Sequence, residues 1–292
     1  MSSNSNNTLK HFAVRPEPVD TVSRAAFTHT RRGTMKRTRT LFVVTALFSF
    51  VLASVSFGQA TAGNVSLEYL QTVDMQKTAA FEEGFKKHLA WRKAQGDTWR
   101  WDTWQLVRGE KLGLYYTSTD GHAWKDFDSE PIDAVEGGAN YTASVGDALL
   151  AISGGMSVIL PDLSNLPEGE VKAGALVEVV AWDVKPGRMD DLMQAIGRYH
   201  EAFAKVAPEE KYLWTMSVNG GPGTVSVVLP RASWADFEPG EKSPDMILEE
   251  AFGRAESIAV SERFSSSIEN TTTTVWMYRA DMSYIPAKSS SE

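Results

Sequence analysis

Two histidines have the chemistry to act on a small molecule. His88 and His200 lie 112 residues apart, each in a segment whose apolar residues recur at helical spacing. An imidazole on a helix can act as a general base or as a ligand at a cavity mouth. It can equally be a half-buried side chain that hydrogen-bonds to a neighbour, so both interpretations stay open. A haem ligand is possible but no further motif supports it, and the sequence predicts neither a cofactor nor a metal site.

A tryptophan-containing segment occurs twice, at an offset of 110 residues. Trp104 aligns with Trp214, and Trp124 aligns with Trp234. Trp124 and Trp234 each begin a Trp-x-Asp-Phe motif. Because tryptophan is rare, these coincidences indicate an internal duplication. Trp104 and Trp214 are expected at equivalent places, either in the core or lining a pocket for an aromatic ligand. Together with Tyr199 and His200, they are the predicted ligand-binding residues.

Other side chains in the duplicated segment differ between the copies. His122 occupies a position where the second copy has Ala232, which is a mild hint of a site, although a solvated loop residue has the same pattern. Asp126 and Asp236 recur in both copies. They are predicted to cap short helical turns, because a carboxylate can accept from free backbone N–H groups there.

The elements that would position these residues follow one order in both copies. The predicted order is strand, helix, strand, strand, helix, strand. A second pair of similar segments, Asp162–Pro167 and Asp281–Pro286, lies at the ends of the two copies. The sequence thus predicts a first repeat over 63–167, a linker over 168–173, a second repeat over 174–287 and a tail over 288–292. The strands are expected over 65–73, near 104, 112–118, 156–160, 176–184, 214–218, 225–229 and 271–278, and the helices over 78–94, 140–152, 189–203 and 244–267.

This order, with a strand running into Val184-Lys185-Pro186-Gly187-Arg188 and then a helix, resembles the dimeric α+β barrel superfamily. That superfamily includes antibiotic-biosynthesis-monooxygenase-like, EthD-like and NIPSNAP-like domains. The resemblance covers most of 63–287, and the first repeat lacks the Pro-Gly turn. It implies an α+β fold in which two tandem ferredoxin-like β-α-β-β-α-β repeats pair their antiparallel sheets into an intramolecular barrel, because a lone sheet has one bare apolar face.

The N-terminal region is predicted to be a targeting region. Residues 1–34 are polar and indicate a disordered extension or a start placed too early. A basic stretch from Met35, an apolar run and small residues up to Ala62 are typical of a signal peptide over 35–62. A retained membrane anchor is the alternative, and an Arg pair leaves the twin-arginine route open. The protein is therefore expected to be periplasmic or secreted after cleavage near Ala62, and to meet a membrane only through an uncleaved segment.

Charge and composition exclude several classes of function. Residues 63–292 carry a net charge of −14, which argues against a nucleic-acid partner. The chain contains no cysteine, so disulfides and thiol chemistry are excluded. Nucleotide-binding, zinc-protease and serine-hydrolase motifs do not occur in it.

Three functions remain open from the sequence. The first is an exported protein that binds a small apolar or aromatic molecule. The second is a cofactor-independent monooxygenase or isomerase, which the superfamily resemblance allows. The third is a structural or interaction domain without a ligand. The sequence decides neither whether a reaction occurs nor whether the protein is a monomer or a homodimer.

Overall fold

The computed structural model describes residues 63–166, 172, 174–220 and 224–286. They belong to the compact unit Val55–Glu292, and the other unit, Met1–Ser54, contains no described residue. The predicted N-terminal extension, the signal peptide, most of the linker, a hairpin tip at 221–223 and the whole tail lie outside the described residues. No helix in the described part of the chain is both long and apolar enough to cross a membrane.

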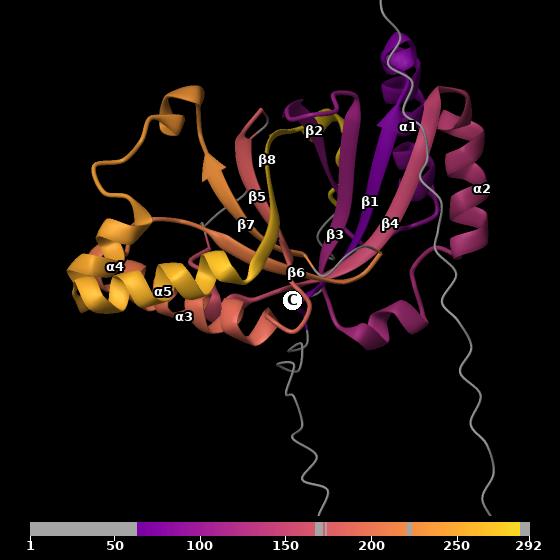
Figure 1. The fold of residues 1–292 in the computed structure, drawn as a ribbon. Coiled ribbons are helices and arrows are strands. Elements are labelled where there is room, and N and C mark those ends of the chain that lie inside the picture. Colours follow the sequence, from indigo (N-terminus) through magenta and orange to yellow (C-terminus); the bar gives the residue numbers. More distant parts are fainter. Residues whose placement is uncertain (1–62, 167–171, 173, 221–223, 287–292) are drawn as a thin grey trace, which may run out of the picture. The chain divides into compact units, whose positions relative to one another are not determined.

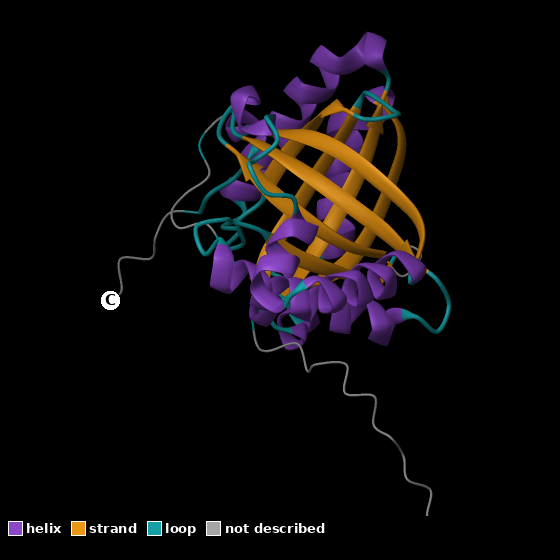
Figure 2. Ribbon diagram, turned by 60° about the vertical axis from the view of Figure 1, so that its left-hand side comes forward, coloured by secondary structure: helices purple, strands orange, loops and turns teal. Residues whose placement is uncertain are grey.

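Eight antiparallel strands close into a barrel in the order β1-β3-β2-β8-β5-β7-β6-β4 (Figure 2). Side chains alternate along each strand between the barrel interior and the outer face. The strands are β1 (Val65–Val73), β2 (Asp102–Arg108), β3 (Leu114–His122), β4 (Leu149–Ile159), β5 (Leu176–Val184), β6 (Leu213–Asn219), β7 (Thr224–Arg231) and β8 (Ile268–Tyr278).

The helices cover the outer face of the barrel in two groups. In Figure 1, α1 and α2 lie beside the strands of the first repeat, and α3, α4 and α5 lie beside those of the second. Gly84 lets α1 and α2 approach closely, since a Cβ there would stand 2.1 Å from the carbonyl oxygen of Ser144. The helices are α1 (Thr78–Ala94), α2 (Ala134–Val145), α3 (Met189–Val206), α4 (Pro244–Phe252) and α5 (Arg254–Ser266).

The predicted fold is confirmed. Each half has the order β-α-β-β-α-β, with α4 and α5 together taking the place of one helix in the second half. The two halves meet where β2 pairs with β8 and where β4 pairs with β6. One chain therefore supplies both halves of an α+β barrel.

The two halves also exchange their C-terminal segments. The 3-10 helix η6 (Ala280–Met282) buries Met282 completely in the core formed by α1 and the first-half strands. Correspondingly, η4 (Pro161–Leu163) places Leu163 against the core of the second half. Arg279 adds polar contacts from the second repeat to Glu82 on α1, at 2.5 and 2.8 Å. Each core is thus completed by the other repeat.

The predicted equivalence of Trp104 and Trp214 is wrong by one residue. The backbone N–H of Thr103 donates to Ser283 Oγ, and that of Trp214 donates to Ser164 Oγ, both at 2.9 Å. Thr103 is therefore the structural counterpart of Trp214. Because side chains alternate along a strand, the one-residue shift places the two tryptophans on opposite faces of the barrel.

Two helices also differ from their predicted ranges. The second helix of the first repeat begins at Ala134, because Asp133 caps it by accepting from two backbone N–H groups. The residues expected to end that helix instead belong to β4. The predicted long helix of the second repeat is interrupted at Gly253, whose φ is 87°. The first part of that helix begins where predicted, at Pro244, because Ser243 Oγ accepts from the N–H of Met246 at 3.3 Å and caps it.

Candidate functional site: two cavities between sheet and helices

Each half contains a cavity between the outer face of the barrel and its helices. The repeat 2 cavity has a volume of about 420 Å³, and the repeat 1 cavity about 200 Å³. The two lie at corresponding places, because Tyr69 and Val180 hold the same position in the paired strands, as do Gln71 and Trp182. The duplication thus produced two related cavities whose linings differ.

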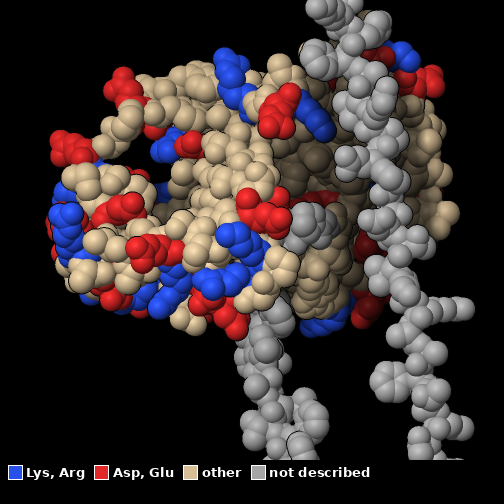
Figure 3. Space-filling view, viewed as in Figure 1, with Lys and Arg blue, Asp and Glu red and all other residues tan. Residues whose placement is uncertain are grey.

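The repeat 2 cavity has mostly aromatic and aliphatic walls. Trp182 of β5 and Trp214 of β6 stack at its floor with ring centroids 5.6 Å apart. Helix α3 contributes Tyr199 and Phe203, because its apolar stripe faces the strands. Figure 3 shows a hollow bordered by the segment that leads from β7 to α4, and Pro244 and Asp245 at the end of that segment line the cavity. The other lining residues are Val180, His200, Glu210, Lys211, Tyr212, Val227, Leu229, Pro244, Asp245 and Phe264.

A few polar groups are fixed at the wall of this cavity. His200 Nδ1 lies 3.0 Å from the hydroxyl of Tyr212. The Tyr199 hydroxyl donates to Asp245 at 2.8 Å, and burial raises the pKa of Tyr199 to about 12. Apolar walls with a small number of oriented polar groups are typical of a site for a small organic molecule.

Three of the four predicted ligand-binding residues lie together in the repeat 2 cavity. They are Trp214, Tyr199 and His200. Trp104 does not join them, since it faces the barrel interior and packs against Tyr278 with ring centroids 5.0 Å apart. The hydroxyl of Tyr278 in turn donates to Asp102 at 2.7 Å.

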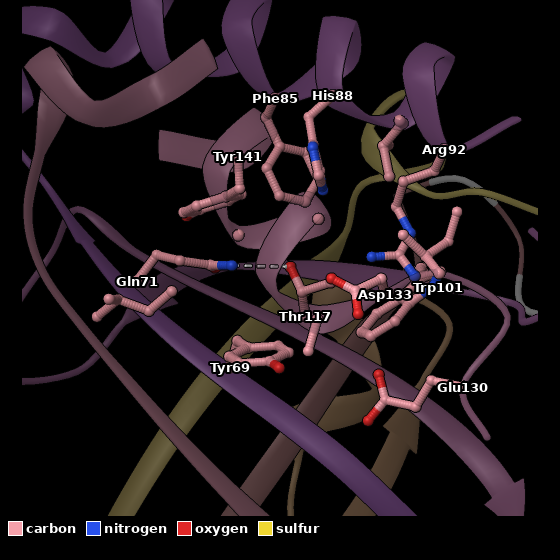
Figure 4. A pocket seen from close by; sticks show the side chains of 16 residues that line it. Tyr69, Gln71, Phe85, His88, Arg92, Trp101, Thr117, Glu130, Asp133 and Tyr141 are labelled. Carbon is pink, nitrogen blue, oxygen red and sulfur yellow. Dashed lines mark hydrogen bonds between the residues drawn. The ribbon is translucent and has the colours of Figure 1, made fainter. Parts of the chain in front are cut away.

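The repeat 1 cavity contains the other predicted histidine. His88 of α1 is buried, its Nδ1 lies 2.8 Å from Asn140 Oδ1, and desolvation lowers its pKa. Figure 4 shows His88 with Phe85 and Tyr141 on one side and Gln71 and Thr117 on the strands below. Gln71 is not among the site residues predicted from the sequence. The signal was available, because Gln71 is the one amide in the alternating apolar stripe of β1.

His122 and the two repeated aspartates do not reach either cavity. His122 Nε2 lies 2.6 Å from Thr119 Oγ1, and its ring packs on Trp99 with centroids 4.0 Å apart. Burial lowers its pKa. Asp126 and Asp236 accept from the N–H groups of Ala123 and Ser233 at 2.8 and 2.9 Å, which confirms the predicted capping role.

The repeat 2 cavity contains a histidine that could bind a haem iron, but it lacks the cations that the haem propionates would need. His200 could supply an axial nitrogen, with the Tyr212 hydroxyl holding its ring. Two propionates would need cations, but Lys211 is the one basic residue in the lining, beside the acidic Glu210 and Asp245. Among the described residues, no three His, Asp or Glu side chains gather closely enough to hold a metal ion. The lining of the repeat 2 cavity therefore does not fit haem.

The fold and its cavities define the class of protein: an intramolecular α+β barrel with a ligand-sized cavity in each half. No family model matches the chain, and no curated protein matches it. Among solved structures, an anthrone oxidase-like protein is similar at 13% identity, covering 76% of this chain and 93% of its own, with a TM-score of 0.49. A chlorite dismutase mutant from Candidatus Nitrospira defluvii is similar at 10% identity, covering 76% and 93%, with a TM-score of 0.47.

Proposed function

We propose that the protein is an exported binding protein for a small apolar or aromatic molecule, which it holds in the repeat 2 cavity. The observation that carries this proposal is the aromatic lining of that cavity, with Trp182, Trp214 and Phe264 around a volume of about 420 Å³. Such a volume lies in the range of roughly 300–1,000 Å³ typical of small-molecule sites. A single chain closes the barrel, so a monomer suffices for binding.

The polar groups of the cavity fit a ligand with one polar end. His200, Tyr212 and Lys211 lie among its lining residues, while Val180, Val227 and Leu229 present apolar surface from the strands. An aromatic ligand would therefore bury its body on the strands and turn a hydroxyl or carbonyl toward the histidine. Export rests on the signal-like residues 35–62.

Binding of a neutral fluorescent probe tests this function. N-phenyl-1-naphthylamine should gain fluorescence with the protein and quench Trp182 and Trp214, which line the cavity. Val180→Phe adds a ring to the cavity wall and should weaken binding at least tenfold. Val135→Phe adds the same bulk at a site that is 81% exposed and should change nothing. The proposal fails if the wild type does not bind the probe, or if folded Val180→Phe binds it equally well.

A separate measurement tests export. The N-terminal sequence of protein recovered outside the cytoplasm should begin at Gly63. A first residue upstream of Met35, or retention in the cytoplasm, would contradict the predicted signal peptide.

A second candidate is a cofactor-independent oxygenase or isomerase that uses His200 as its base. The observation in its favour is the imidazole fixed by Tyr212 beside an apolar cavity. Oxygen consumption with 1-naphthol, lost in His200→Gln, would support the oxygenase. Probe binding without turnover would leave the binding protein, and the absence of both would favour a domain without a ligand.

A further inference from the structure

The repeat 1 cavity contains two buried polar atoms without a hydrogen-bond partner. They are Oε1 of Gln71 and the hydroxyl of Tyr141. Burial raises the pKa of Tyr141, but its hydroxyl lies close enough to the Gln71 amide for that amide to lower this pKa in part, so Oε1 of Gln71 is the atom left without a hydrogen-bonding neighbour. Both residues line the cavity, and Gln71 is only 2% exposed. A buried polar atom without a partner destabilises the folded protein, so in a cavity it marks a place where a ligand group or an ordered water hydrogen-bonds.

The side chain of Gln71 is held so that its oxygen is the free atom. Its Nε2 donates to Thr117 Oγ1 at 3.3 Å (Figure 4). Thr117 Oγ1 in turn lies 3.2 Å from Thr103 Oγ1. The carbonyl oxygen is therefore left as an acceptor. Trp182 occupies the position of the repeat 2 cavity that corresponds to Gln71, and its side chain has no hydrogen-bond acceptor.

The other polar groups of the repeat 1 cavity are also acceptors or are already engaged. Glu130 and Asp133 line the cavity, and neither forms an ion pair within the described residues. Asp133 caps α2 through its Oδ1, and Glu130 lies within range of the positive charge of Arg92. Arg92, the one Lys or Arg in the lining, donates to Asp97 at 2.6 Å and stacks on Trp101 at 4.4 Å, and His88 Nδ1 is paired with Asn140. A ligand with several N–H donors and a positive charge thus complements this lining.

The hydrophobic part of the lining suits a small body beside that charge. Tyr69 and Trp101 stack with ring centroids 6.2 Å apart, and Phe85 meets Tyr141 edge-on at 6.2 Å. Aromatic faces attract cations and also bury apolar groups. The cavity volume of about 200 Å³ limits the ligand to roughly one ring.

We propose that the repeat 1 cavity is a second binding site, which takes a small organic cation with a primary ammonium group and one aromatic or short apolar body. The ammonium donates to Gln71 Oε1 and faces the carboxylates of Glu130 and Asp133. An ammonium has three donors and no acceptor, which matches a lining of acceptors. This site is independent of the apolar ligand proposed for the repeat 2 cavity.

Calorimetric titration with benzylamine tests the second site. The wild type should bind benzylamine at least tenfold more tightly than benzyl alcohol, which has the same ring without the charge. Gln71→Leu, which keeps the side-chain bulk, should weaken benzylamine binding about tenfold or more. Glu130→Gln should weaken it several-fold, and raising the salt concentration should remove part of that difference.

The matched control is Val180→Phe, which changes only the repeat 2 cavity and should leave benzylamine binding unaltered. Gln71→Leu should in turn leave N-phenyl-1-naphthylamine binding unaltered, so the two proposals fail separately. The second site is ruled out if benzylamine gives no binding heat at millimolar concentration or binds no better than benzyl alcohol. It is equally ruled out if benzylamine binds folded Gln71→Leu and Glu130→Gln as it binds the wild type.

Discussion

Replacing Met282 tests whether the second repeat completes the core of the first. Met282 is fully buried and packs in the cluster that contains Phe81, Trp101 and Tyr115. Truncation of a buried methionine to alanine costs about 2–5 kcal/mol, because apolar contacts are lost and a cavity remains. Since several aromatic rings surround this side chain and cannot collapse into the space, we expect about 3 kcal/mol for Met282→Ala.

Urea unfolding measures this loss directly. With a slope of roughly 2–3 kcal/mol per molar urea, the midpoint should fall by about 1–1.5 M. Circular dichroism and tryptophan fluorescence should report the same single transition, because the exchanged segments couple the halves. Met246→Ala, at a position that is 53% exposed, is the matched control and should change stability by less than about 0.5 kcal/mol. A loss below about 1 kcal/mol for Met282→Ala, or a first half that keeps its stability while the second half unfolds, would refute the reasoning.

Two further predictions concern stability. Glu68 accepts from Ser157 Oγ, and burial raises the pKa of Glu68. The folded state therefore binds more protons than the unfolded state, so stability falls as pH rises from the unfolded-state pKa of this carboxyl through its folded-state pKa. Glu68→Gln should therefore raise the melting temperature at pH 7 and lose that advantage at pH 3.5; an equal gain at both would contradict the sign. Gly253 adopts φ 87° with open space around it, so an added Cβ meets no neighbour and only strains the backbone. Gly253→Ala should therefore lower the free energy of unfolding by about 1–3 kcal/mol, as measured by thermal unfolding. An unchanged stability would contradict the predicted strain.

Strong local periodicity predicted most elements of the fold. The first strand of each half, Val65–Val73 and Leu176–Val184, and the first helix, Thr78–Ala94, match their predicted bounds. The duplication predicted how they assemble, because a half-barrel must cover its bare sheet face. Where glycine conformation or a single cap decided the outcome, at Gly253 and Asp133, the apolar pattern alone did not show it.

The site was less accessible to sequence reasoning, because it depends on which face of a strand a side chain takes. Trp104 and Trp214 match in sequence yet face opposite sides of the barrel, since the paired strands are aligned one residue away from the sequence match. Gln71 is distinctive in the sequence as the one amide in the apolar stripe of its strand, but its unpaired oxygen follows only from the packing of the folded chain. By contrast, the helical stripe that contains Tyr199 and His200 placed both correctly on one side of α3.

The covalent joining of the two halves removes a symmetry constraint. A barrel made from two identical chains has two identical cavities, and every substitution appears in both at once. In the joined chain, Gln71 and Trp182 occupy equivalent positions and could diverge independently. One chain can thus hold two chemically different cavities at a fixed one-to-one ratio, which a homodimer of identical halves cannot do.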